Sequence, residues 1–358
     1  MFSSFFEPIK YDRKIIKSKT PWVDKYRPKK LDDIVQQDEV KSILKASLIC
    51  GNIPHLLLYG PPGTGKTSTV LACCYELFGP KIITDRVLEL NASDESGINI
   101  VRNKIMEFAK KSLCAPDPEH PSPEFKLIIL DEADAMTTEA QSALRKVIEE
   151  YSGTTRFCFI CNYINQIIDP IISRCMKFRF KPITKENILI KLKEICEKEN
   201  FNIDVKILSK INDIAKGDAR KSIMILQNLK YLYDYNNKKI THTDVYNLTG
   251  YVSKKIIKKI FNICINPDNN LDKIFKSVNY LKLKGFPVVS VLMTLNEIII
   301  ETTKISDKQK SDIFYNLSLT EKKLTDGADE YIQLINVFAY ILNLVKYPEN
   351  IITPEILV

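Results

Sequence analysis

The stretch "GPPGTGKTS", residues 60–68, decides the fold of this 358-residue chain. It follows the apolar run "HLLLYG" (55–60) and opens a helical pattern that runs from about Lys66 to Phe78. It matches G-x-x-x-x-G-K-[ST], in which glycines let the backbone wrap a phosphate and the helix N-terminus supplies positive potential. A Gly-Pro turn before a helix is the simpler interpretation, but the full match in this context favours a phosphate-binding loop. The residues that would bind nucleotide there are Gly60, Pro61, Pro62, Gly63, Thr64, Gly65, Lys66, Thr67 and Ser68.

A second motif supplies the acidic residues that the phosphate-binding loop lacks. The run "LIILDEAD" (127–134) is an apolar strand pattern that ends in Asp131 and Glu132. Ligands bind at the carboxyl ends of parallel strands, so both acids are expected beside the loop. Lys66 would contact the β and γ phosphates, and Thr67 and Asp131 would hold a magnesium ion. Glu132 would polarise the attacking water as a base.

Strand and helix patterns alternate through the first half of the chain. Further strands are predicted over 87–91, 155–162 and 176–180, and a helix is predicted from Gly97. Alternation of helices with continuously apolar strands predicts an α/β fold with a parallel sheet covered on both faces.

After about Pro182 only helical patterns remain. The last of them is marked by the helical spacing of Ile332, Ile335, Ala339 and Leu342. The expected domains are a basic tail (1–20), an α/β nucleotide-binding domain (21–182), a small helical lid (183–252) and an all-helical C-terminal domain (253–358).

Composition narrows the protein class. Hydrophobic residues make up 45% and charged residues 27%, as in ordinary folded soluble proteins. No apolar run approaches the roughly 18 residues that span a bilayer, so no membrane partner is expected. The net charge of +8 permits an acidic partner such as nucleic acid without demonstrating one. Cys158 and Cys161 would point to opposite faces of a strand, which disfavours a metal pair.

Each of three polar residues has an ordinary structural interpretation beside a functional one. Asn162 ends an apolar strand, where it could touch a γ-phosphate or simply turn the chain. Arg220, in "GDARKSI", begins a helix and could be a solvated charge. Arg174 stands before the strand "MKFRF" and is either an ordinary surface charge or a cation held out for another molecule.

A series of stretches, in this order, resembles one family: the small subunits of the eukaryotic sliding-clamp loader, replication factor C, which are AAA+ ATPases. The resemblance is dense over about residues 20–250 and continues through "SDKQK" and "DGADEYIQLIN". The stretches are "PWVDKYRPKKLDDIV" (21–35), "GPPGTGKTS", "LELNASD" (88–94), "LDEAD", "TRFCFICNY" (155–163), "ISRCMKFRF" (172–180) and "GDARKSI" (217–223).

This resemblance implies a role for each matching residue. Asp131 and Glu132 would be the magnesium-binding and catalytic acids, while Asn162 and Arg220 would sense the γ-phosphate of ATP. Arg174 would be an arginine finger that enters the ATP site of a neighbouring subunit. The remaining roles fall on Tyr26, Arg27 and Pro28, which would lie near the adenine, and on Asn91, which would hold Glu132 inactive until DNA binds.

The resemblance also implies partners. The chain would join other loader subunits in a heteropentamer in the nucleus, held together by the C-terminal domain as a collar, and would bind the sliding clamp and primer–template DNA. Arg102 and Arg145, on the helices before and after "LDEAD", could contact DNA or be solvated charges. Relatives usually carry an arginine where this chain has Ser96, so one expected phosphate contact is missing.

Two other function classes use the same parts. One is a hexameric AAA+ DNA motor such as a branch-migration helicase. The other is a structural subunit that binds ATP but barely hydrolyses it, against which the intact Lys66, Asp131, Glu132 and Arg174 argue.

Overall fold

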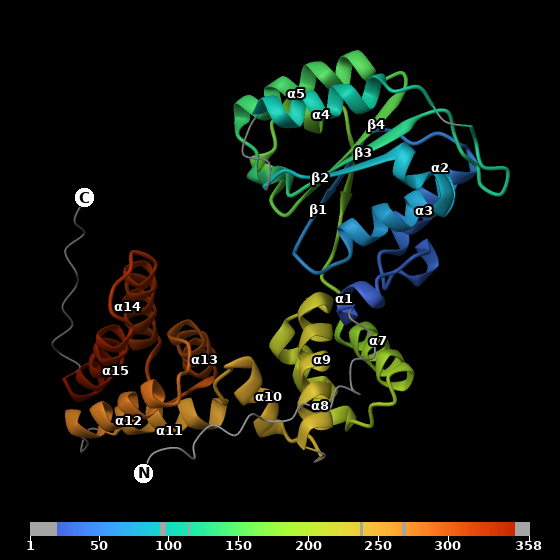
Figure 1. Ribbon diagram of the computed structural model, residues 1–358. Coiled ribbons are helices and arrows are strands. Elements are labelled where there is room, and N and C mark those ends of the chain that lie inside the picture. The colour runs from blue at the N-terminus through green and yellow to red at the C-terminus, as the bar shows by residue number, and fades with distance from the viewer. Residues whose placement is uncertain (1–19, 94–97, 114, 237–238, 267–269, 348–358) are drawn as a thin grey trace, which may run out of the picture. The chain divides into compact units, whose positions relative to one another are not determined.

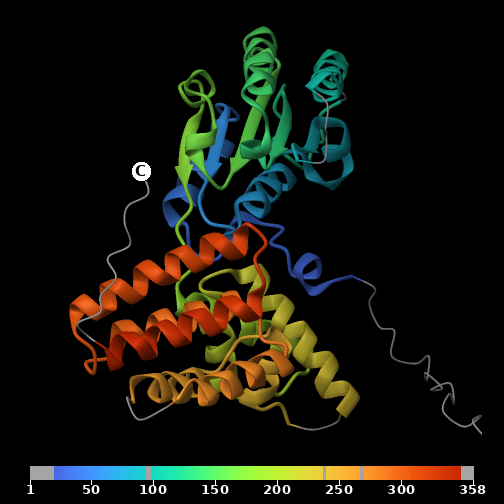
Figure 2. The same ribbon diagram turned by 90° about the vertical axis from the view of Figure 1, so that its left-hand side faces the viewer.

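The computed structural model describes residues 20–93, 98–113, 115–236, 239–266 and 270–347. The chain divides into two compact units, Met1–Tyr235 and Asn236–Val358 (Figures 1 and 2). Among the helices of these described ranges, none is both long and apolar enough to cross a lipid bilayer.

The first unit is built on a parallel sheet with the strand order β2-β3-β4-β1-β5. Strands β1, β3 and β4 are almost entirely buried, as expected for a sheet with both faces covered. The parallel α/β fold predicted from the sequence is confirmed. The strands are Leu56–Tyr59 (β1), Val87–Asn91 (β2), Lys126–Asp131 (β3), Thr155–Cys161 (β4) and Met176–Arg179 (β5).

Helices pack on both faces of the sheet and create two separate cores (Figure 1). Cys158 belongs to the core shared with α2 and α3, and Cys161 to the core shared with α4 and α5. The two cysteines therefore do point to opposite faces. The covering helices are α2 (Asp38–Ile49) and α3 (Lys66–Arg86) on one side, and α4 (Ile98–Lys110), α5 (Thr138–Tyr151) and α6 (Asp169–Ile172) on the other.

Helix α3 contains a break that the sequence pattern locates only in part. The helical pattern predicts an end near Phe78, and the backbone leaves the helical region at Gly79, with φ 68° and ψ 169°. A second helical segment then starts at Pro80, a residue suited to a first helical turn because its nitrogen has no hydrogen to donate. A Cβ atom at Gly79 would lie 2.2 Å from the His120 ring, so this break requires glycine.

Short elements and three further helices complete the first unit. Among these elements α9 contacts the phosphate-binding loop directly, because the amide of Ala219 donates to the carbonyl of Gly63 (3.2 Å). The elements are α1 (Trp22–Lys25), η2 (Leu31–Asp33), η3 (Ala133–Ala135), η4 (Ile164–Gln166), α7 (Lys185–Lys198), α8 (Val205–Ala215) and α9 (Ala219–Asn236).

The described part of the second unit is all-helical, as predicted, and has its own core. In its last helix the buried face includes Val337 and Phe338, whereas Ile332 is 61% exposed. The helices are α10 (His242–Thr249), α11 (Lys254–Ile265), α12 (Leu271–Leu283), α13 (Val288–Glu301), α14 (Asp307–Thr325) and α15 (Glu330–Lys346). The three-domain division of the chain stays a prediction.

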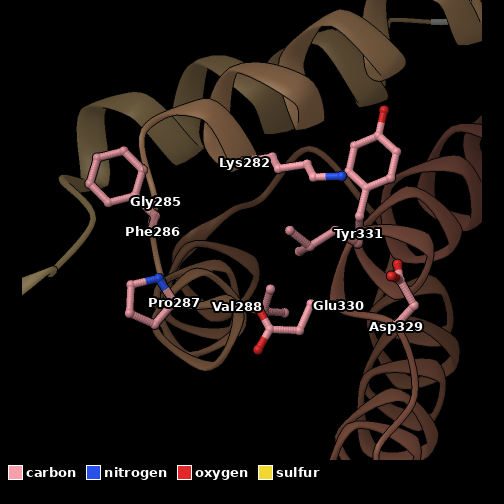
Figure 3. Close-up of a pocket in the computed structure, with 9 residues that line it drawn as sticks. Lys282, Gly285, Phe286, Pro287, Val288, Asp329, Glu330 and Tyr331 are labelled. Carbon is pink, nitrogen blue, oxygen red and sulfur yellow. The ribbon is translucent and has the colours of Figure 1, made fainter.

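A pocket of about 270 Å³ lies in this second unit, where the turn between α12 and α13 meets the start of α15 (Figure 3). Phe286, Pro287 and Val288 supply its apolar lining, and the Lys282 ammonium stands 4.4 Å from the ring centre of Tyr331. None of the site residues predicted from the sequence lines it.

Candidate nucleotide-binding site

The predicted site residues of the first unit gather at one edge of the sheet. Gly60 follows β1, Asn91 ends β2, Asp131 ends β3 and Asn162 follows β4. Because all these strands are parallel, their carboxyl ends meet at the same edge, with Asn91 paired to Asp131 in the register. This edge is where open α/β sheets bind ligands.

The loop of residues 60–68 requires glycine at specific points. Gly60 has φ 143°, and a Cβ atom there would lie 2.4 Å from the carbonyl oxygen of Phe180. Gly63 and Gly65 have φ 70° and 94°, and Gly65 directly precedes the first residue of α3. The loop therefore leads into a helix N-terminus, where backbone amides and the helix dipole favour an anion.

Lys66 is held inside this loop. Its side-chain Nζ donates to the carbonyls of Gly60 (2.7 Å) and Pro61 (2.9 Å) and to Asn162 Oδ1 (2.9 Å). The residue is only 8% exposed, and burial lowers its pKa while the Asp131 carboxylate opposes that shift. The motif lysine and the strand-end asparagine thus lie in direct contact.

Thr67 and Asp131 form the second pair of the site. The Thr67 hydroxyl donates to Asp131 Oδ2 (2.8 Å), and Asp131 Oδ1 accepts from the amide of Glu132 (2.9 Å). Hydroxyl and carboxylate oxygens are ligands that Mg²⁺ favours, so the donor set fits this ion. Glu132 has a left-handed backbone (φ 54°) and is exposed, which leaves its carboxylate available to a substrate water.

Asp134 contributes to the site, although the motif spacing predicts no role for it. Its Oδ2 accepts from the amides of Asn162 (2.9 Å) and Tyr163 (3.1 Å), and so fixes the segment that presents the Asn162 side chain to Lys66. The signal was available, because Asp134 ends the "LDEAD" motif, but its partners depend on how β3 and β4 pair.

Asn91 and Arg220 lie beside this group. Asn91 Oδ1 accepts from the amide and the hydroxyl of Ser93 (3.1 and 2.9 Å), and no bond to Glu132 occurs among the described residues, so the proposed restraint stays a prediction. Arg220 is an exposed residue in the first turn of α9. Burial is the main factor that lowers the pKa of Lys66, and the positive charge of Arg220 lowers it further.

The N-terminal segment reaches the same region. Arg27 Nε donates to Ser68 Oγ (3.4 Å), beside the loop, and the Tyr26 hydroxyl donates to Glu199 (2.5 Å) at the end of α7. Pro28 is half-buried next to them. These contacts place residues 26–28 between the phosphate-binding loop and α7. Their contact with an adenine ring stays a prediction.

Arg174 lies at the opposite edge of the sheet. It precedes Met176, the first residue of β5, which pairs with Leu56 at the amino end of β1. Its guanidinium donates to the carbonyl of Pro170 (2.8 Å) and to Glu149 Oε1 (2.6 Å). The structure therefore does not bring Arg174 to its own phosphate-binding loop.

Of the two candidate DNA contacts, only Arg145 has a described side chain. Arg145 is exposed on α5 and its Nε donates to Glu149 Oε1 (3.3 Å). Arg102 lies on α4, but its side chain is outside what the structure describes, and Ser96 lies outside the described residues altogether. Their roles stay predictions.

Two family models match the chain. Residues 56–183 match "ATPase family associated with various cellular activities (AAA)", which covers the sheet and its loop. Residues 252–340 match "Replication factor C C-terminal domain", which covers most of the second unit.

Curated relatives match along nearly the whole chain. Replication factor C subunit 4 of Arabidopsis thaliana is 45% identical over 326 residues, covering 90% of this chain and 95% of that protein. Replication factor C subunit 2 of Saccharomyces cerevisiae is 46% identical, covering 90% and 93%. Replication factor C subunit 4 of Homo sapiens is 44% identical, covering 90% and 88%.

Solved structures give a more distant likeness. The RuvB Holliday junction branch migration motor of Thermotoga maritima aligns with a TM-score of 0.52 at 17% identity, covering 66% of this chain and 80% of that one. At that identity the likeness shows a shared fold alone.

Proposed function

The chain belongs to the replication factor C small-subunit family, and on that premise we propose how its residues serve an ATP-dependent clamp loader. It is an AAA+ ATPase and a subunit of a multisubunit loader. A hexameric branch-migration motor is not favoured, because the full-length relatives are replication factor C subunits and the motor shares only the fold.

The edge site would bind ATP with magnesium. Lys66 and the loop amides would hold the phosphates, and Thr67 and Asp131 would hold the ion, which neutralises phosphate charge when bound. Glu132 would orient and deprotonate the attacking water, while Asn162 and Arg220 would contact the γ-phosphate. Tyr26, Arg27 and Pro28 would face the adenine. The direct contacts among Lys66, Asn162, Thr67 and Asp131 support this assignment.

One observation carries the proposal that Arg174 serves another chain. Met176 pairs with Leu56, whereas Phe180 donates to the carbonyl of Tyr59, beside the loop. The four residue steps from Met176 to Phe180 span roughly 13 Å along the strand, and Arg174 lies beyond Met176, still further from the loop. A guanidinium at that edge is available to a neighbour's ATP, where an arginine finger raises the rate by about 10³–10⁵.

The proposed cycle uses these parts in sequence. ATP binding between subunits organises a spiral that opens the sliding clamp, primer–template DNA enters, and hydrolysis weakens the grip on both so that the clamp closes on DNA. Arg102 and Arg145 would contact the phosphate backbone, which carries no sequence information. Residues 21–182, 183–252 and 253–358 would act as ATPase domain, lid and collar, in the nucleus.

The test is Arg174→Ala in the reconstituted complex, with Lys177→Ala as control, since Lys177 is an exposed cation and the second residue of β5. R174A should lower clamp- and DNA-stimulated ATP hydrolysis while this chain's own ATP binding is unchanged. The loss should disappear when the motif lysine of the neighbouring site is already replaced. Normal hydrolysis by R174A would show that the assignment in trans is wrong.

A further inference from the structure

We propose that Glu149 is a positioning residue that orders Arg174 for the nucleotide of the neighbouring subunit. This inference rests on the proposed role of Arg174 as an arginine finger. Glu149 lies on α5 and Arg174 follows α6, so the fold brings together two residues that are far apart in the sequence.

The contacts fix the guanidinium at two points. Nη2 donates to Glu149 Oε1 (2.6 Å), and Nη1 donates to the carbonyl of Pro170 in α6 (2.8 Å). An arginine has five N–H donors in a planar fork, so these two bonds set the plane and leave the other donors for an outside ligand. The Arg174 side chain is still 38% exposed, which allows such a ligand to reach it.

Preordering matters for a finger that must meet charge in a transition state. A long arginine side chain has many rotamers, and fixing them during the reaction would raise the barrier. A carboxylate bound on one side of the guanidinium removes that freedom beforehand. Glu149 is itself held, because its Oε1 also accepts from Arg145 Nε (3.3 Å) one helical turn earlier.

Glu149 does not neutralise the finger completely. One carboxylate is shared by two arginines, so the group of Arg145, Glu149 and Arg174 keeps an excess positive charge. Under the proposed function Arg174 presents its charge to the ATP of a neighbouring subunit, while Arg145 lies on the side that contacts DNA. The contact therefore orders Arg174 without removing its attraction for an anion.

The first experiment is Glu149→Gln in the reconstituted loader, with Glu150→Gln as the matched control. Glu150 is the next residue of α5 and is exposed, and among the described residues Arg145 and Arg174 both pair with Glu149 instead. We expect E149Q to lower kcat about tenfold with little change in KM, as loss of one charge-assisted hydrogen bond predicts. E149D should restore part of the rate, and E150Q should match the parent complex.

A double variant then separates this inference from the function on which it rests. In an R174A background, E149Q should cause no further loss, because Glu149 acts through Arg174. Equal losses with and without Arg174, or a severe R174A beside a silent E149Q, would overturn the role of Glu149 alone. A silent R174A would overturn the finger itself, and this inference with it.

Two binding measurements exclude a merely structural effect. E149Q should weaken trapping of ADP with fluoroaluminate by the complex, as R174A should, while E150Q should not. Affinity for primer–template DNA should stay level or rise in E149Q, because a negative charge next to Arg145 is lost. Unchanged trapping, or a fall in DNA affinity that accounts for the slower hydrolysis, would contradict the proposal.

Discussion

Glu132 and Asp131 are adjacent carboxylates with different surroundings. Asp131 uses one oxygen to accept from Thr67 and the other to accept from the Glu132 amide. Glu132 has a left-handed backbone and an exposed side chain. The first is therefore suited to hold an ion with Thr67, and the second to meet a water.

Glu132→Gln should separate ATP binding from hydrolysis. The amide keeps the shape of the side chain but cannot take a proton, so hydrolysis at this site should fall by about 10²–10⁴ with ATP affinity retained. Both are measured in the reconstituted loader, with Glu139→Gln on the exposed start of α5 as control. Unchanged total hydrolysis would instead indicate a subunit that binds ATP without turning it over.

Motif spacing predicted which residues would share the sheet edge, because parallel strands bring their carboxyl ends together. The contacts of Lys66 with Asn162 and of Thr67 with Asp131 agree with that geometry, while their roles remain predictions. The contact of Glu149 with Arg174 could not be predicted in this way. Only the i,i+4 spacing of Arg145 and Glu149 was visible, and Arg174 reaches them through the packing of α5 and α6.

At the scale of elements, the phosphate-binding loop is joined to α9. A Cβ atom at Gly63 would lie 1.8 Å from Asp218 Oδ1, and that oxygen accepts from the amide of Lys221 as a cap of α9. Gly65 also has positive φ, but a Cβ atom there meets nothing within 4 Å.

Gly63→Ala should therefore loosen the start of α9, and Gly65→Ala should not. Displacing the Asp218 carboxylate removes a cap, and amide exchange at the beginning of α9 should accelerate about fivefold, the factor that a cap of about 1 kcal/mol gives. Hydrogen–deuterium exchange of both variants without nucleotide measures this. Equal acceleration would point to backbone strain in the loop as the cause, since both variants share it.

Elements could be predicted from sequence where one signal dominated. Strands β1, β3 and β4 contain continuous apolar runs, and the positions of all five strands agree with the prediction to within a residue or two. The helix end predicted near Phe78 coincides with the break at Gly79, but the second helical segment that follows from Pro80 was not predicted, because Gly79-Pro80 usually ends a helix. The helical spacing in α15 predicted a helix there but not its buried face, since Leu342 is buried while Ile332 is exposed and only packing decides between them.

Phe338→Ala tests which face of α15 carries the second unit. Phe338 is fully buried, so its truncation should cost about 3–5 kcal/mol in the free energy of unfolding of that unit. Ile332→Ala, on the same helix but 61% exposed, should change it little. Urea unfolding followed by hydrogen exchange in α11–α15 distinguishes them, with nucleotide binding by the first unit as a folding control. A large loss for I332A would indicate that Ile332 is covered in solution.

At the scale of the whole molecule, the proposed ATP site and the proposed finger of one chain cannot meet each other. Lys66 lies at the carboxyl edge of the sheet and Arg174 beyond the amino end of β5. The separation is set by the strand itself, so no side-chain rotation closes it. An isolated chain should therefore bind ATP and hydrolyse it poorly, since its own site lacks an arginine from outside.

We expect the isolated chain to bind ATP with an affinity close to that in the loader but to hydrolyse it at least about 10³ times more slowly. Single-turnover hydrolysis compares it with a loader in which every other site carries a motif-lysine substitution. The isolated E132Q chain gives the background from contaminating ATPases. A rate that rises steeply with the concentration of the chain alone would mean that copies supply Arg174 to one another, the behaviour of a self-assembling motor. A rate equal to that in the loader at all concentrations would mean that this site needs no arginine from a neighbour.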